Sequence, residues 1–407
     1  MPEQTHSVIS ASFRSSFENQ HVTIPSIYKL VPEWKPDLHN GYEIARDESL
    51  NPWIRRWAVN QDTARSLCAA DFGRFAALLV PNYRSYKILS SVSKYFAWYF
   101  LFDDIFDCGS LKYDQLGAER YRDASLEYFR FTLLGQGSMP DLSSFDVQLQ
   151  NALHSWNEIG EHIREACSLG TRELLCTEML RYISSLTNVD SLFKDDQEVP
   201  SIKKYWERRE ATAGAFCVIA TIPFAYGVDV DKSVYDNPVM YELWRHASSF
   251  VHISNDMFSF RKELMDDQYE NLIPVLMLNY NINCNVAMQK GYDFLRSEAS
   301  GLRLSSEMLP SSSENLSPAV SDAFIRGCFD TAMGLAHWSY SGARYLKGCN
   351  RNDDNTISFT IHRQRQLEET KTHYEPVQSK LPSNTGDPTV LDKIRSMAPK
   401  LQGVATL

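Results

Sequence analysis

Three aspartates stand at the end of a stretch that is otherwise apolar and aromatic. Asp103, Asp104 and Asp107 close a run that begins near Ser90 and predicts a buried helix. On a helix, Asp103 and Asp107 share a face, with Asp104 beside them. A buried carboxylate costs free energy unless it is paired or bound to a metal, and a helix C-terminus disfavours negative charge. The pattern therefore indicates ligands for Mg²⁺, which binds carboxylates together with water and phosphate. The alternative is a helix end whose acids face water.

A second polar cluster lies far downstream. Asn255, Ser259 and Glu263 occur at i, i+4 and i+8, which places them in one stripe on one helix face. The stripe combines an amide oxygen, a hydroxyl and a carboxylate, all hard oxygen donors that suit Mg²⁺. Lys262, next to Glu263, could reach an anion held by the metal. A solvated face of an amphipathic helix is the alternative, and it explains the Asn and Ser poorly.

Helices must position these clusters, because nearly every ordered segment of the chain has helical periodicity. The sequence contains no convincing strand alternation and no internal repeat. Val218 to Gly227 is apolar with Pro223 inside it, which predicts a kinked or broken helix. The predicted fold class is therefore all-α. The clearest helices are predicted at 90–106, 172–186, 241–265 and 321–346.

The two ends of the chain differ in composition from this helical region. Residues 1–23 are rich in Ser and Gln, whereas residues 351–407 lose their apolar periodicity and include a stretch rich in Pro, Ser and Thr. We expect a flexible N-terminal tail, one helical domain over 24–350, and a polar, largely disordered C-terminal tail.

Composition argues against several kinds of partner. The 407 residues carry a formal net charge of -10, which disfavours nucleic acid and anionic membranes. The eight Cys form no C-x-x-C pair and no zinc-like cluster, so we expect reduced thiols in an intracellular protein. The sequence has no signal-peptide core and no apolar run of transmembrane length. A cytoplasmic monomer or homodimer is expected, without nucleic acid and without stable membrane insertion.

The two polar clusters together resemble the metal motifs of class I terpene synthases, and more narrowly those of fungal-type sesquiterpene cyclases. D-D-I-F-D from Asp103 to Asp107 matches the aspartate-rich motif, and the N-D-x-x-S-x-x-x-E pattern from Asn255 to Glu263 matches the second motif. The resemblance covers about 24–350. It implies a single class I terpenoid synthase helical bundle around a central active-site cavity.

The resemblance also implies roles for the motif residues. A trinuclear Mg²⁺ cluster, in which Mn²⁺ can substitute, would polarise the diphosphate of a small prenyl diphosphate substrate. The ligands implied are Asp103, Asp104, Asp107, Asn255, Ser259 and Glu263. Arg209 lies where the family places a diphosphate-sensing arginine, and Arg344-Tyr345 resembles its C-terminal Arg-Tyr pair. Together with Lys262, these three would donate to the departing diphosphate, the arginines bidentately.

Aromatic faces would stabilise the carbocation formed by ionisation, by cation–π attraction. Phe100 and Trp338 are the main candidates. For Phe96 and Phe216, ordinary core packing is the preferred interpretation. The family's linker and effector positions after the sensor arginine correspond to Thr212 and Ala213, where bacterial relatives often carry Asp and Gly.

A second departure follows the second motif. Many relatives have a His-Asn pair there, and this chain has Glu270-Asn271. These departures concern the details of cation initiation and leave the reaction class unaffected.

The function predicted is cyclisation of farnesyl diphosphate to a cyclic sesquiterpene hydrocarbon or alcohol with release of diphosphate. Residues 102–111 also resemble cyclases that begin by 1,11-closure. The alternatives are a cyclase for another prenyl diphosphate and a non-catalytic helical scaffold. A chain-elongating prenyl diphosphate synthase would carry a second aspartate-rich motif, which the Asn/Ser/Glu pattern replaces. A protonation-initiated cyclase would need D-x-D-D, and the run from Asp229 to Lys232 lacks its last Asp.

Overall fold

The computed structural model describes residues 11–107, 109–111, 114–186, 201–266, 268–312 and 316–362. These residues form an all-α bundle with one small sheet, which confirms the predicted fold class. The first half contains α1 (Ala11–Ser16), α2 (Tyr42–Ile44), α3 (Asn51–Trp57), α4 (Gln61–Ala70), α5 (Phe72–Leu79), α6 (Tyr86–Asp107), α7 (Gln115–Leu134), α8 (Val147–His154), α9 (Asn157–Ala166) and α10 (Leu169–Ser185). The second half contains α11 (Ile202–Thr212), α12 (Ala215–Ile219), α13 (Ile222–Tyr226), α14 (Pro238–Met265), α15 (Leu272–Tyr280), α16 (Cys284–Met308) and α17 (Pro318–Ser341).

Single turns and three short strands complete the described part of the chain. The turns are the 3₁₀ segments η1 (Ile27–Lys29), η4 (Lys232–Asp236) and η5 (Leu309–Ser311) and the π segment η2 (Ala45–Leu50). The strands are β1 (His21–Ile24), β2 (Asn350–Arg351) and β3 (Ile357–Thr360). In the part of the chain described, no helix is both long enough and apolar enough to cross a bilayer.

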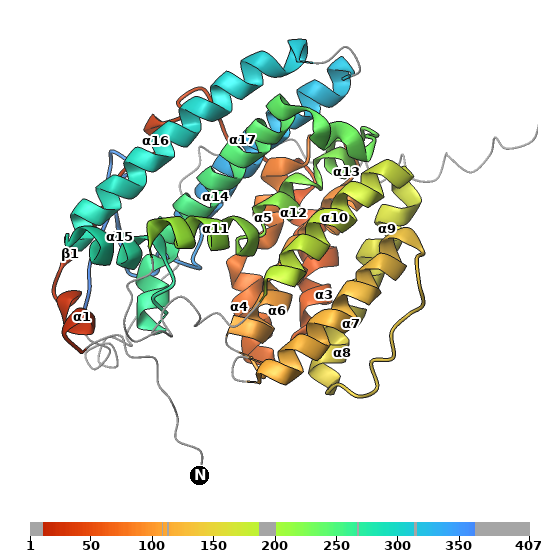
Figure 1. The fold of residues 1–407 in the computed structure, drawn as a ribbon, viewed down its shortest axis with the longest axis horizontal. Helices are drawn as coiled ribbons and strands as arrows, with labels where there is room; N and C mark the ends of the chain where they lie inside the picture. Colours follow the sequence, from red (N-terminus) through yellow and green to blue (C-terminus); the bar gives the residue numbers. More distant parts are fainter. Residues whose placement is uncertain are drawn as a thin grey trace, which may run out of the picture. The chain divides into compact units, whose positions relative to one another are not determined.

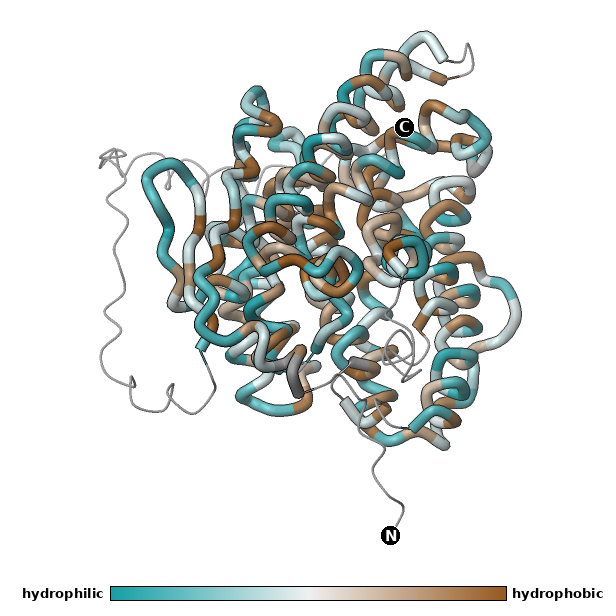
Figure 2. Tube along the Cα trace, turned by 60° about the vertical axis from the view of Figure 1, so that its left-hand side comes forward, coloured by the Kyte–Doolittle hydropathy of each residue, from teal (hydrophilic) through white to brown (hydrophobic). Residues whose placement is uncertain are grey.

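Two groups of packed helices hold the two polar clusters. The helix α14 packs against both α16 and α17, whereas α6 packs against α5 and α7 packs against α10 (Figure 1). The helix α17 also contacts α5, which links the two groups. Apolar and polar residues alternate along most helices (Figure 2), as expected of helices that bury one face and expose the other.

Most predicted helices are found, with shifted ends. The predicted 90–106, 172–186 and 241–265 lie within or close to α6, α10 and α14. The apolar run with Pro223 is broken as predicted, into α12 and α13, and Gly227 ends the second with a left-handed φ of 73°. The helix α17 is shorter than predicted and ends at Ser341, where Gly342 adopts extended backbone. Arg344 and Tyr345 therefore lie on the segment after the helix.

The ordered region extends beyond the predicted limits of 24 and 350. The strand β3 pairs antiparallel with β1 on one side and with β2 on the other, in the register His21 to Thr360 and Asn350 to Ser358. The prediction of tails at 1–23 and 351–407 was therefore wrong over 11–23 and 351–362. Strands of four residues or fewer carry too little alternation to be recognised in sequence. Residues 1–10 and 363–407 lie outside the described residues.

Asp330 fastens two distant segments to α17. Its Oδ1 accepts a hydrogen bond from Trp34 Nε1 and its Oδ2 accepts one from Tyr226 Oη, both at 2.8 Å. The carboxylate thereby joins the segment before α2 and the end of α13 to α17. Removing it would leave two donors without their acceptor inside the protein.

We therefore predict that Asp330→Ala lowers the free energy of unfolding by roughly 2–4 kcal/mol, since each orphaned buried donor costs about 1–3 kcal/mol. Urea denaturation followed by circular dichroism measures this change. Asp322→Ala is the matched control, because Asp322 is an exposed aspartate on the same helix. Equal stabilities of the two variants would show that Asp330 does not fasten these segments.

Candidate active site

A cavity of about 520 Å³ collects most of the residues singled out in the sequence. Its walls come from α5, α6, α11, α12, α14, α17 and the segment after α17. The lining includes twelve of the predicted site residues, most of them polar or charged. They are Asp103, Asp104, Arg209, Thr212, Ala213, Asn255, Lys262, Glu263, Arg344 and Tyr345, together with Phe96 and Phe100.

The acidic end of α6 reaches the cavity through two of its aspartates. Asp103 Oδ1 accepts a hydrogen bond of 2.7 Å from Tyr182 Oη, which comes from α10. Burial raises the pKa of Asp103 and of Asp104 above the usual range for aspartate, against the opposing effects of Tyr182 and Arg344. The side chain of Asp107 lies outside the description. Two carboxylates thus face one cavity at a cost that a bound cation would relieve.

The second cluster occupies one face of α14. Asn255 and Glu263 line the cavity, and burial raises the pKa of the Glu263 carboxyl. Ser259 is buried between them in sequence but is not part of the lining. Lys262 Nζ lies 2.9 Å from Asp266 Oδ2, so this lysine is already paired.

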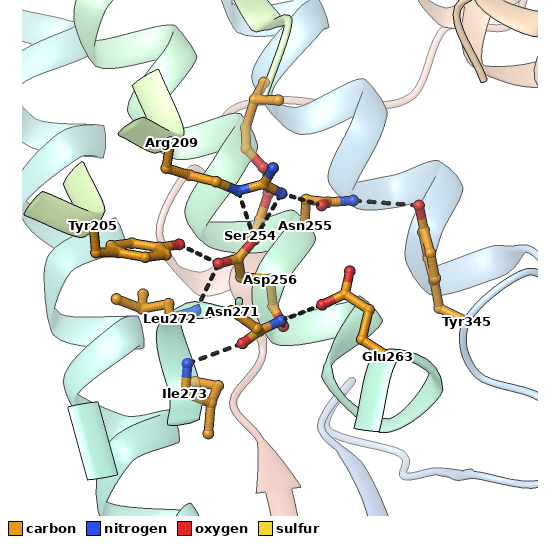
Figure 3. Close-up of polar contacts among 11 residues, drawn as sticks. Tyr205, Arg209, Ser254, Asn255, Asp256, Glu263, Asn271, Leu272, Ile273 and Tyr345 are labelled. Atoms are coloured by element: carbon orange, nitrogen blue, oxygen red, sulfur yellow. Dashed lines mark hydrogen bonds and ion pairs between the residues drawn. The ribbon is translucent and has the colours of Figure 1, made fainter. Parts of the chain in front are cut away.

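Asp256, next to Asn255, is a fully buried carboxylate with donors on both of its oxygens (Figure 3). Its Oδ1 accepts from Arg209 Nε at 3.1 Å and from Arg209 Nη2 at 2.8 Å. Its Oδ2 accepts from Tyr205 Oη and, at 2.7 Å, from the backbone N–H of Leu272. Three elements, α11, α14 and α15, therefore meet at one side chain, which holds Arg209 beside the cavity.

Asn255 is bonded on both sides of its amide. Its Oδ1 accepts from Arg209 Nη2 at 2.9 Å, and its Nδ2 donates to Tyr345 Oη at 3.3 Å. Figure 3 shows this chain of contacts running from Arg209 through Asn255 to Tyr345. Asn255 is therefore held by two of the four residues that the sequence predicts to bind diphosphate.

Asn271 connects the two ends of the second motif. Its Nδ2 donates to the backbone carbonyl of Asp256 and to Glu263 Oε2, both at 2.8 Å, while its Oδ1 caps α15 by accepting from Ile273 N. The side chain thus fixes the Glu263 carboxylate relative to the start of the motif. The neighbouring Glu270 pairs with Arg208, on the helix that carries Arg209.

Arg344 lies over an aromatic ring that the sequence assigned to the carbocation. Its Cζ is 4.6 Å from the centroid of Phe100 and 5.6 Å from that of Tyr345. Phe100 also stacks on Phe72 with centroids 4.5 Å apart. Among the described residues, Arg344 Nε has no hydrogen-bond partner, although it is buried. The guanidinium is therefore positioned by Phe100 and has one buried N–H that is not used by another described residue.

The other predicted aromatics divide between lining and core. Phe96 lines the cavity and stacks on Phe75, with centroids 4.5 Å apart. Trp338 is not among the lining residues and packs behind Phe100, donating from Nε1 to the carbonyls of Ala70 and Asp71. Phe216 also lies outside the lining, under the guanidinium of Arg181 at 4.8 Å.

The backbone break near Arg209 lies one residue beyond the predicted effector position. The helix α11 ends at Thr212, Ala213 is its C-cap, and Gly214 has a left-handed φ of 64° before α12 begins. A Cβ on Gly214 would lie 1.4 Å from Tyr99 Oη. Only glycine both adopts this left-handed φ without strain and leaves the space next to Tyr99 free of a Cβ. Thr212 and Ala213 line the cavity beside the break.

The donor set around the cavity fits a divalent cation. Among the described residues, no three His, Cys, Asp or Glu side chains converge on one point. The oxygens instead come in two separate groups, from α6 and from α14, and burial disfavours the charged forms of Asp103, Asp104 and Glu263. Two of the nearby cations, Arg209 and Lys262, are engaged with acidic side chains of α14 and of its C-cap. Carboxylate and amide oxygens on two facing helices suit Mg²⁺, which retains water and phosphate ligands.

Several residues of the site had no assigned role in the sequence analysis. Tyr182 comes from a separate helix, and no local pattern marks it. Tyr205 lies one turn before Arg209, and His252 lies one turn before Asn255, so helical spacing from a motif residue could have found both. Asn271 precedes an apolar run, so the N-cap preference of Asn could have indicated its capping role, but its contact with Glu263 depends on the packing of α15.

Comparison with known proteins gives one family and one fold. The sequence profile described as "Terpene synthase family 2, C-terminal metal binding" matches residues 94–299, which is half of the chain. The chain is 24% identical over 338 residues to terpene cyclase braA of Annulohypoxylon truncatum, covering 82% of this chain and 88% of the relative. It is also 24% identical over 312 residues to sesquiterpene synthase Agr3 of Cyclocybe aegerita, covering 75% and 84%.

Among solved structures, a variant of cucumene synthase superposes with a TM-score of 0.63 at 20% identity, covering 77% of this chain and 98% of that one. At this identity the likeness establishes the fold. The matched family region of 94–299 contains α14, which carries the second motif, and the part of α6 that carries the aspartates.

We predict that Asn271→Asp lowers turnover roughly 10- to 100-fold, as is usual when a residue that orients a metal ligand is lost. The substitution keeps an acceptor for the α15 cap but replaces the N–H donor to Glu263 by a carboxylate oxygen. Steady-state kinetics at several metal concentrations measures the loss. Asn283→Asp is the control, because Asn283 is an exposed N-cap of α16. If both variants keep full turnover, Asn271 does not orient Glu263.

We predict that Gly214→Ala destabilises the protein by roughly 3 kcal/mol or more, because it combines a left-handed φ with a steric overlap with Tyr99. Gly135→Ala separates the two effects. Gly135 has a φ of 68° with nothing within 4 Å of the position that a Cβ would take, so only about 1 kcal/mol is expected there. Thermal unfolding compares the variants. Equal losses would mean that Tyr99 does not confine Gly214.

Proposed function

Because the chain belongs to terpene synthase family 2 and is a fungal-type class I terpene cyclase that uses a divalent metal, we propose that it is a sesquiterpene synthase. In this proposal it uses Mg²⁺ to ionise farnesyl diphosphate and folds the carbocation into a ring, by 1,11-closure as the resemblance of residues 102–111 implies. A cyclic hydrocarbon or alcohol and diphosphate are then released. The name of the similar Cyclocybe aegerita protein, a sesquiterpene synthase, supports the fifteen-carbon substrate.

The observation that carries the proposal is the division of one cavity into a charged end and an aromatic end. On α6, Phe96 and Phe100 precede Asp103 and Asp104, and on α14 Val251 precedes the lining residues of the second motif. A prenyl diphosphate has the same division, with a charged head and a hydrocarbon tail. The cavity of about 520 Å³ is within the range of ordinary small-molecule sites.

The residues of the charged end would bind the diphosphate head. The metal would be held by Asp103 and Asp104 from α6 and by Asn255, Ser259 and Glu263 from α14, with Asp107 in support. The metal supplies Lewis-acid neutralisation of the diphosphate, which makes it a better leaving group.

Basic and hydroxyl side chains would stabilise the charge that develops as the carbon–oxygen bond breaks. Arg344, with its unpartnered Nε in the described part of the chain, and Tyr345 would donate to the phosphate oxygens. Lys262 would do so after leaving its acidic partner. Arg209 would turn one N–H from Asn255 to the diphosphate, which frees the Asn255 oxygen. Substrate binding would in this way change the hydrogen bonds of the second motif.

The aromatic end would shield and guide the carbocation. Phe96, Phe75 and Tyr99 line the cavity, and cation–π attraction is worth roughly 2 kcal/mol or more when the ring is desolvated. Phe100 would contribute by holding Arg344 as well as by its ring. The predicted aromatics Trp338 and Phe216 would act through packing, since neither lines the cavity.

We expect the purified protein to convert farnesyl diphosphate to a cyclic fifteen-carbon product in the presence of Mg²⁺ and to form none with EDTA. Gas chromatography–mass spectrometry of the organic extract identifies the product. Asp103→Ala and Asn255→Ala should each lower turnover by a factor on the order of 100 or more while the circular dichroism spectrum is kept. Asp62→Ala, at an exposed surface aspartate, is the control.

Parallel reactions with the ten- and twenty-carbon diphosphates test the chain length. A clear preference for the twenty-carbon substrate would replace farnesyl diphosphate in the proposal. Full activity of either motif variant would contradict the metal assignment. No turnover of any of the three substrates by folded wild-type protein would contradict the proposed function as a whole.

A further inference from the structure

His252 is a buried histidine in the wall of the cavity, and the proposed function does not use it. It lies on α14 one turn before Asn255, has 2% of its surface exposed, and belongs to the cavity lining. Its ring rests on Trp206 of α11, with centroids 5.4 Å apart and planes at 32°. The ring is therefore oriented by packing.

Neither ring nitrogen of His252 has a hydrogen-bond partner within the described residues. Buried imidazole nitrogens are normally paired, since an unsatisfied buried polar atom costs about 1–3 kcal/mol. A neutral imidazole has one N–H and one lone pair, so either tautomer presents a free basic nitrogen. An unpaired base in the wall of a cavity that would hold a carbocation has an evident use.

We propose that His252 is the proton acceptor that ends the cyclisation. This assignment rests on the proposed function and adds to it the identity of the base. A C–H bond on a carbon next to the cationic carbon breaks, and its electron pair forms the carbon–carbon double bond of the product. The proton moves to the free nitrogen of His252, giving an imidazolium. That proton passes to solvent or to the released diphosphate when the cavity opens.

The other polar groups of the lining are less suited to this step. Asp103, Asp104 and Glu263 would be bound to metal, and Asp266 is paired with Lys262 at the charged end of the cavity. The hydroxyls and amides that line the cavity are far weaker bases than imidazole. His252 is the one histidine among the described lining residues.

The surroundings of His252 keep it ready for this role. Burial, together with the positive charge of Arg209, lowers the pKa of His252 to about 3, so the ring is neutral near pH 7. A base this weak still removes a proton from a carbocation, which is a much stronger acid. The low pKa also favours loss of the proton afterwards, which prepares the site for another turnover.

His252→Gln and His252→Phe test the assignment, because the first keeps a polar side chain without a basic nitrogen and the second keeps an aromatic ring. Diphosphate release measures ionisation, and gas chromatography–mass spectrometry measures how the cation is quenched. We expect diphosphate release within about threefold of wild type in at least one variant. The wild-type product, as a share of all terpenoid products, should fall about tenfold or more. Hydrocarbons or alcohols formed when the cation is quenched at other carbons should replace it.

Ser248→Ala is the control. Ser248 lies one turn before His252 on α14, outside the cavity lining, and its buried hydroxyl also has no partner among the described residues. Removing this hydroxyl should leave the product spectrum unchanged. Thermal unfolding of each variant establishes that it is folded.

Three results would overturn the assignment. An unchanged spectrum in a His252 variant that still releases diphosphate would make the departing diphosphate the base. A parallel loss of ionisation and product in both folded variants would make His252 a structural residue. The same shift in Ser248→Ala would attribute the change to the packing of α14. Failure of wild type to release diphosphate is separate, since it contradicts the proposed function and not the choice of base.

Discussion

The hydrogen bonds to Asp256 are the contacts on which the rest of the candidate active site depends. A carboxylate that is fully removed from water needs partners for both oxygens, and here they come from a tyrosine, an arginine and a helix N-terminus. Because these donors belong to α11 and α15, the carboxylate fixes both elements against α14. Arg209 and Asn255 are then held beside the cavity without any ligand.

The same contacts explain why part of the second motif faces the cavity and part does not. Asp256 points into the packing between helices, whereas Asn255 and Glu263 line the cavity and are linked through Asn271 and the backbone of Asp256. Hydrogen bonds behind a ligand orient it toward a metal. The buried network orients Asn255 and Glu263 from the side of α14 that packs against α11 and α15.

On the side of α6 and α14 that faces the cavity, hydrogen bonds and nearby charges offset only part of the free-energy cost of burying charged groups. Asp103, Asp104 and Glu263 have raised pKa values, and Arg344 retains an Nε without a partner among the described residues. A protein that gained nothing from these groups would be more stable with apolar residues in their places. Carboxylates whose charged forms are disfavoured by burial, together with a buried guanidinium in the same cavity, suit a metal-bound anion. His252 extends this reasoning to the hydrocarbon part of the cavity, where the unpaired group is a base.

The sequence by itself determined the helical fold class, the family, and the two motifs, because local spacing decides which residues share a helix face. Asp103 with Asp104, and Asn255 with Glu263, could be grouped from spacing alone. The contacts of Tyr182 with Asp103 and of Asn271 with Glu263 could not, since they join segments whose meeting depends on how the helices pack. Only the tertiary structure placed Trp338 behind Phe100, showed a backbone break at Gly214 between α11 and α12, and paired the short strands β1 and β3 from opposite ends of the described chain. In each case the deciding quantity is the steric fit between distant elements, which no local pattern of residues encodes.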